Sequence, residues 1–130
     1  MTSSSDRIFE YRRGTICSGS FTLRGIPVLH TAKLQPRWRP SIRYVNEHTF
    51  STVYAENGDI IVNRIGKAAG HWHIYSGHPM MISDCLYRIK DSNGDIAKKL
   101  KGHNYSFPLR GVAARYIIME DFEAWYMSIV

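Results

Sequence analysis

The stretch that most strongly constrains the fold reads Asn57-Gly58-Asp59-Ile60-Ile61-Val62-Asn63-Arg64-Ile65-Gly66-Lys67. Its first three residues are a turn signal, and a run of three β-branched residues follows. A continuous apolar run of this kind is typical of a strand buried on both faces. We therefore predict a central buried strand over residues 60–62, which leads into a glycine-flanked loop over residues 63–70.

Short apolar or alternating segments lie on both sides of this strand, separated by glycine, proline and asparagine turns. They predict further strands at residues 8–12, 26–31, 42–45, 71–75, 80–82 and 86–90, and short helices at 47–50, 95–101 and 120–127. The pattern indicates an α+β fold, with a short-stranded curled sheet or partial β-barrel and small peripheral helices. At 130 residues the chain is long enough for one domain, which we place at residues 7–130 after a disordered lead-in over residues 1–6.

The composition is that of an ordinary globular protein, with 44% apolar and 22% charged residues, and this excludes wholesale disorder. No apolar run approaches the roughly 18 residues of a membrane span, and the first residues lack the pattern of a secretory signal. The two cysteines, Cys17 and Cys85, are too far apart for a metal-binding spacing. We therefore expect a reduced, cytoplasmic protein that does not contact a membrane.

The charge distribution points to a polyanionic partner. The chain has 17 basic and 11 acidic residues, for a formal net charge of +6. Residues 116–130 hold three acids and no lysine or arginine, so residues 1–115 carry all 17 basic residues against eight acids. Eleven of the basic residues are arginine, whose planar guanidinium suits phosphates and guanines. Nucleic acid is the simplest partner, and a basic surface that only keeps the protein soluble is the alternative.

Three groups of motifs together resemble a known family. They are Gly25–Leu34, then residues 57–67 followed by Ile82–Ile89, and then Arg110–Ile117 followed by Glu120-Asp121-Phe122. In this order and spacing they resemble the target-recognition domain of type I restriction-modification specificity subunits. The related recognition domains of type IIG enzymes and γ-class adenine methyltransferases are also similar. The resemblance covers about residues 25–123.

The resemblance implies a DNA-binding, target-recognition module of a restriction-modification or related defence system. Such a module reads a short duplex sequence and delivers it to a separate methyltransferase or nuclease subunit, without a cofactor of its own. The chain departs from a complete specificity subunit because it has one recognition domain and no heptad-bearing helix, and because the stretch between Lys90 and Gly111 is short. It also lacks an Asn-Pro-Pro-Tyr-type motif and a glycine-rich cofactor loop, so we expect no enzymatic activity from the chain by itself.

The loop after the central strand holds the first candidate DNA-binding residues. Asn63 is the type of side chain that reads adenine, Arg64 the type that reads guanine, and Lys67 suits a phosphate. The alternative is a tight turn that carries solvated charges.

A second candidate group is Arg37-Trp38-Arg39, in a loop held between two prolines. The indole suits stacking on a base or a groove edge, with the guanidiniums on phosphates. Arg43 extends the same positive face. The alternative is a tryptophan folded onto the core between two exposed arginines.

The motif His71-Trp72-His73 raises the question of a metal. On a strand the two imidazoles share a face, but no glutamate or cysteine pair completes a site nearby. We therefore expect DNA contact by His71 and His73, or a structural role, rather than metal binding. Two other functions stay open: a stand-alone nucleic-acid-binding or regulatory module with an RNA or protein partner, and a small histidine-metal enzyme.

Overall fold

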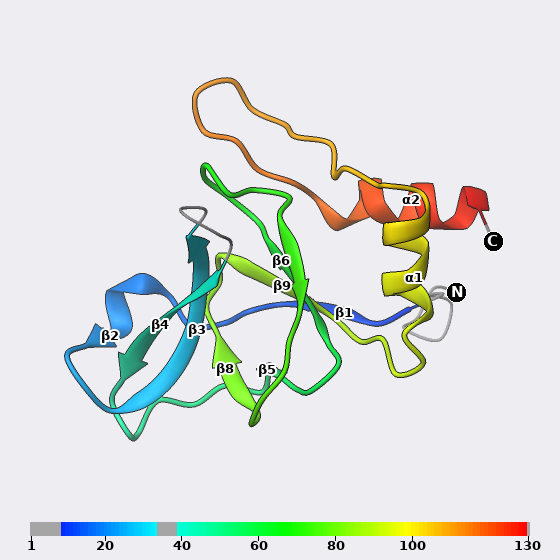
Figure 1. Ribbon diagram of the computed structural model, residues 1–130. Helices are drawn as coiled ribbons and strands as arrows, with labels where there is room; N and C mark the ends of the chain where they lie inside the picture. The colour runs from blue at the N-terminus through cyan, green and yellow to red at the C-terminus, as the bar shows by residue number, and fades with distance from the viewer. Residues whose placement is uncertain (1–8, 34–38, 130) are drawn as a thin grey trace, which may run out of the picture.

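The computed structural model describes residues 9–33 and 39–129, and it is an α+β fold with two open β-sheets and two helices (Figure 1). The first sheet has the strand order β1-β9-β6-β7, and the second has the order β2-β4-β3-β8-β5. The strands are β1 (Tyr11–Arg13), β2 (Phe21–Thr22), β3 (Ile26–Lys33), β4 (Arg39–Val45), β5 (Tyr54–Ala55), β6 (Ile60–Asn63), β7 (Trp72–Ile74), β8 (Met80–Ile82) and β9 (Leu86–Ile89). The helices are α1 (Asp95–Gly102) and α2 (Met119–Ile129), and a 3₁₀ turn covers Ser18–Ser20.

Strand β6 is buried on both faces, which confirms the prediction for residues 60–62. Ile60 and Val62 belong to the larger apolar cluster, which the two helices cover with Leu100, Phe122 and other side chains. Ile61 points the other way, because successive strand residues face opposite sides, and it packs in a second cluster. The continuous apolar run therefore serves two cores.

The second cluster joins the two sheets. It brings Ile61 and Leu86 of the first sheet against Leu29 and Ile82 of the second. Figure 1 shows the consequence: the first sheet lies between the helices and the second sheet. Most strand pairs are antiparallel, but β3 and β8 run parallel, with Val28 opposite Met81.

The expectation of one curled sheet or a partial β-barrel is wrong. Strands β8 and β9 are adjacent in sequence but belong to different sheets, so the chain changes sheet at residues 83–85. In the described part of the chain, neither sheet is closed by pairing of its edge strands. The second sheet covers the second face of β6, so this face is buried without the interior of a barrel.

The two helices form where the sequence predicts them, with ends that differ by one or two residues. The Asp91 carboxylate accepts hydrogen bonds from the backbone N–H groups of Ile96 and Ala97, both at 3.0 Å, and so satisfies the start of α1. The predicted helix at residues 47–50 is absent; this segment is a turn in which Asn46 accepts from the Thr49 N–H at 2.9 Å. Neither described helix is long and apolar enough to cross a membrane.

Candidate nucleic-acid interface

The basic residues are segregated along the sequence, and the fold brings their segments together. Fourteen of the 17 lie in three stretches that contain no Asp or Glu: seven in residues 11–46, two in 60–83 and five in 96–119. The Gly66 N–H donates to the Arg115 carbonyl at 2.9 Å, and the Ile117 N–H donates to the Arg64 carbonyl at 2.9 Å. These two bonds join the second stretch to the third.

The first stretch is joined to the same region through the turn between β8 and β9. The Gly14 N–H donates to the Leu86 carbonyl at 3.0 Å, and the Asp84 N–H donates to the Ile16 carbonyl at 2.9 Å. On the other side of this turn, the Arg64 N–H donates to the Cys85 carbonyl at 2.8 Å. Backbone hydrogen bonds therefore hold residues 14–16, 64–66 and 115–117, one segment of each stretch, near the turn over residues 84–86, which itself contains Asp84.

Two arginine side chains converge on this turn. The Nε atoms of Arg64 and Arg13 both donate to the Asp84 carbonyl oxygen, at 2.7 and 3.2 Å. Neither guanidinium has a carboxylate within 4.0 Å in the part of the chain that the structure describes. The exposed Lys67 and Arg115 lie on the adjoining loops and likewise have no ion pair among the described residues. We call Arg13, Arg64, Lys67 and Arg115 the basic cluster.

The anchoring leaves the outer edge of both guanidiniums available. A guanidinium has five N–H donors in a fixed fork, and only the Nε donor of each is used here. The half-buried Tyr87 lies beside both groups. Burial raises the pKa of its hydroxyl, the Arg64 and Arg13 charges oppose this rise, and the Glu120 charge adds to it. The Nη atoms of the two arginines therefore form a fixed, positively charged surface that an anion or a guanine edge fits.

The Arg64 and Lys67 side chains lie on this surface, but Asn63 does not. Asn63 is the last residue of β6 and is 1% exposed, so it is not in the loop where the sequence analysis placed it. Its side-chain amide has no hydrogen-bond partner among the described residues. As the structure places it, the amide is out of reach of a base edge. The alternation from Ile61 to Asn63 on one strand face was the sequence signal for this burial.

The histidines and the remaining predicted residues are dispersed. His71 is exposed, whereas His73 lies on β7 opposite Ile61, and burial lowers its pKa to about 4. Within the described ranges no three His, Cys, Asp or Glu side chains are grouped closely enough to hold a metal ion. Arg43 is exposed on β4 in the second sheet. Arg37 and Trp38 lie outside the described residues, as does the side chain of Arg39.

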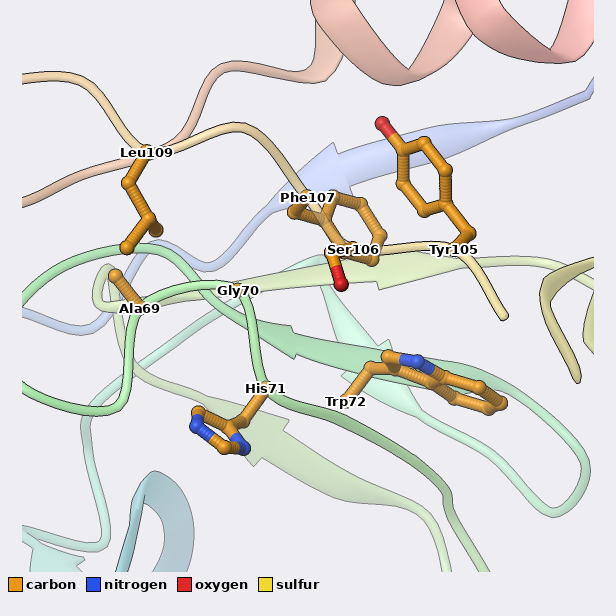
Figure 2. Close-up of a pocket in the computed structure, with 8 residues that line it drawn as sticks. All are labelled: Ala69, Gly70, His71, Trp72, Tyr105, Ser106, Phe107 and Leu109. Carbon is orange, nitrogen blue, oxygen red and sulfur yellow. The ribbon is translucent and has the colours of Figure 1, made fainter. Parts of the chain in front are cut away.

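A pocket that the sequence analysis missed adjoins the loop between β6 and β7. It has a volume of about 330 Å³ and is lined by residues 69–72, 105–107 and 109. Figure 2 shows Trp72 on one side of it and the segment from Tyr105 to Phe107 on the other, with the Ser106 hydroxyl directed into the space between them. Tyr105 is held by a stacked contact with Trp125, with ring centroids 4.1 Å apart. The pocket therefore combines the aromatic side chains of Trp72 and Tyr105 with polar and small residues, beside a positively charged surface.

Arg13 and Arg115 were also missed as candidate residues. Motif reading did not identify them because Arg13 belongs to a short Arg12-Arg13 pair outside any recognised motif, and Arg115 stands alone after three apolar residues. The distribution of acids was the available signal, since both lie in long stretches without a carboxylate. The chain matches no known protein-family model and no curated protein sequence.

Proposed function

We propose that this protein is a sequence-specific duplex-DNA-binding module of the target-recognition class that its sequence resembles. It delivers DNA to a separate methyltransferase or nuclease subunit and has no catalytic activity of its own. The observation that carries the proposal is the pair of guanidiniums of Arg13 and Arg64, fixed on one backbone carbonyl and unpaired with a described carboxylate.

This geometry supports base reading because the side chains are oriented before DNA arrives. An arginine held through Nε loses less conformational freedom on binding than a free surface arginine. Its two Nη donors match the O6 and N7 acceptors of guanine in the major groove. Arg64 comes directly after β6, so a fully buried strand of the first sheet fixes its backbone.

The other two cations of the basic cluster support a phosphate role. Lys67 and Arg115 are exposed and their side chains make no hydrogen bond or ion pair within the described residues. A flexible cation of this kind binds a phosphate of any sequence, which positions the protein without selecting bases. Duplex binding therefore combines general phosphate contacts with local base reading.

A second candidate function follows from the aromatic pocket. Trp72 and Tyr105, which are both half-buried beside a cationic surface, are of the type that binds unpaired bases by stacking. This favours a single-stranded RNA or DNA ligand for the alternative, stand-alone module. Competition between a duplex and a single strand of equal length separates the two functions, since the target-recognition proposal requires that the duplex binds more tightly.

A selection from random duplexes, followed by one substitution, tests the proposal. Once the enriched site is known, Arg64→Ala should lower affinity for that site by about 1–3 kcal/mol and change non-specific binding little. The matched control is Arg24→Ala, which removes an exposed arginine between β2 and β3. The proposal fails if folded protein binds duplexes but enriches no sequence, and Arg64 loses its role if the variant discriminates as well as the wild type.

A further inference from the structure

A loop closed by a single antiparallel β-bridge projects from the body of the protein beside the basic cluster. Arg110 and Tyr116 form an antiparallel pair, with N–H to carbonyl distances of 2.8 and 3.1 Å, and so close a loop over residues 111–115. We call residues 110–116 the tip ribbon. In Figure 1 it is the orange loop that extends beyond the sheets, at the opposite end from the C-terminus of α2.

The tip ribbon has a fixed conformation. The Arg110 guanidinium donates two hydrogen bonds to the Asp121 carboxylate on α2, at 3.0 and 2.9 Å, and the Arg115 carbonyl accepts from Gly66. Gly111 has a φ of +87°, and a Cβ atom there would lie 2.1 Å from the Ala114 carbonyl oxygen. The turn therefore requires glycine at residue 111, and the sequence supplies it. The ribbon is attached to both α2 and the loop after β6.

The apex of this fixed loop is apolar and contributes nothing to the core. Val112 is 95% exposed, and Ala113 and Ala114 are also exposed. Three consecutive apolar residues at the end of a braced ribbon stabilise neither the clusters nor the sheets. Their exposure points to contact with another molecule.

The charge around the ribbon identifies the kind of molecule. The ribbon lies in the acid-free stretch 96–119, and Lys67 and Arg115 of the basic cluster lie at its base. This surface is complementary to a polyanion. The major groove of DNA is wide enough for a two-stranded ribbon and therefore for a narrow loop such as this one. Inside the groove the exposed methyl group is the C5-methyl of thymine, which small apolar side chains contact.

We propose that the tip ribbon enters the major groove and that Val112 reads the C5-methyl group of a thymine in the target site. This inference rests on the proposed duplex-binding function and deepens it. Arg110 is a positioning residue, because its ion pair with Asp121 holds the ribbon and leaves its guanidinium engaged. Val112 supplies the apolar contact, and Arg64 supplies the polar contact nearby.

Replacement of thymine by deoxyuridine tests the inference, because the exchange removes one methyl group and no hydrogen-bonding atom. In duplexes that carry the selected site, deoxyuridine at one or two positions should weaken wild-type binding about fourfold, the effect of one buried methyl group. Val112→Ser should bind the two duplexes equally. The control Leu23→Ser, which changes a side chain that is 99% exposed between β2 and β3, should keep the fourfold difference.

The outcomes separate the inference from the proposed function. If no duplex is bound or no site is enriched, both fail. If a site is bound but wild-type protein tolerates deoxyuridine at every thymine, or the site has no thymine, the tip ribbon does not read a methyl group and the DNA-binding function stands. Loss of a co-purified catalytic subunit by Val112→Ser, with unchanged thymine preference, would instead assign the tip to a protein contact. Circular dichroism of each variant confirms that it is folded.

Discussion

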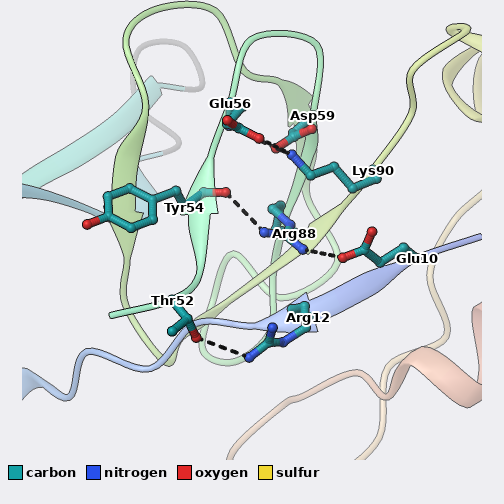
Figure 3. Close-up of polar contacts among 8 residues, drawn as sticks. All are labelled: Glu10, Arg12, Thr52, Tyr54, Glu56, Asp59, Arg88 and Lys90. Atoms are coloured by element: carbon teal, nitrogen blue, oxygen red, sulfur yellow. Dashed lines mark hydrogen bonds and ion pairs between the residues drawn. The ribbon is translucent and has the colours of Figure 1, made fainter. Parts of the chain in front are cut away.

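Two groups of basic side chains in this protein differ in how their charge is balanced. In the first, Arg88 donates from Nη2 to the Glu10 carboxylate at 3.0 Å and from Nη1 to the Tyr54 carbonyl at 3.2 Å (Figure 3). Lys90 in the same group contacts the carboxylates of Glu56 and Asp59. We call these residues, with Arg88, the paired network. In the basic cluster, by contrast, Arg13 and Arg64 share a neutral carbonyl and no described carboxylate.

The difference shows which charges serve the fold. In the paired network each cation neutralises an anion, and the hydrogen bond from Lys90 lowers the pKa of Glu56. In the basic cluster two cations are brought close together, which costs free energy by repulsion and is relieved when an anion binds. The network therefore stabilises the folded chain, whereas the cluster is suited to a ligand.

The largest effect is expected from a break in the paired network. Arg88 is 5% exposed and its guanidinium satisfies the Tyr54 carbonyl. Arg88→Ala leaves that carbonyl without its donor and creates a cavity between the sheets, so the free energy of unfolding should fall by about 2–4 kcal/mol. Urea denaturation measures this loss.

The control for this change is Arg12→Ala. Arg12 is exposed, lies opposite Arg88 in the β1–β9 pair, and reaches only the Thr52 hydroxyl at 3.4 Å. Its loss should change the stability by less than about 0.5 kcal/mol. Equal effects of the two substitutions would mean that the paired network does not stabilise the fold.

The pH dependence of stability should reveal a third kind of basic side chain, one that the fold keeps neutral. His73 faces the same side of the first sheet as Arg88, since both lie opposite Ile61. Burial lowers its pKa to about 4, so below about pH 6.5 the unfolded chain binds a proton that the folded chain excludes. The free energy of unfolding should therefore fall as the pH is lowered from about 6.5 to 4, by up to about 1.4 kcal/mol per pH unit.

Substitutions identify the side chain that causes this pH dependence of the free energy of unfolding. His73→Gln should remove most of it, and His30→Gln a smaller part, because burial and Arg43 also lower the pKa of His30. The pKa of Glu56 is lowered from 4.5 by its hydrogen bond from Lys90, so its stabilising contribution is lost only at the acid end of this range and below it. A slope that is unchanged in His73→Gln would show that another group controls the acid response.

The sequence predicts the parts of this fold that depend on local chemistry. The three β-branched residues Ile60–Val62 identified β6, and the polar turn before Asp95 identified α1. The division into two sheets was not predictable in this way, because the chain passes between the sheets several times, as at residues 83–85, and no local signal marks these changes. A strand buried on both faces is compatible with a barrel and with a sheet between two layers, so the sequence left both open.

The candidate site likewise contains residues that the local sequence predicts and residues that it does not. Arg64 was predictable because it is charged and directly follows the central strand. Its neighbour Asn63 was assigned wrongly to the loop, because β6 is one residue longer than its apolar run and turns the amide inward. The contact of Arg13 with the same carbonyl as Arg64 joins residues 51 positions apart, and only the pairing of β1 with β9 and β6 with β9 brings them together. Local motifs carry no information about such a pairing.

The smallest effect is expected for a single phosphate-binding lysine of the basic cluster. This lysine has no described carboxylate partner, unlike the cations of the paired network. Lys67 and Arg115, the two cations with a phosphate role, should together contribute about −1.8 to the slope of log K against log salt for any duplex. Lys67→Ala should make this slope shallower by about 0.9 and should weaken selected and random duplexes alike, because phosphates are the same in every sequence.

Lys101→Ala is the matched control: this lysine is exposed in the last turn of α1 and should leave the slope unchanged. Measurements between 50 and 200 mM salt, a range over which such contacts change affinity strongly, distinguish the two. A slope that responds to Lys101 and not to Lys67 would move the DNA contact from the basic cluster to the exposed face of α1.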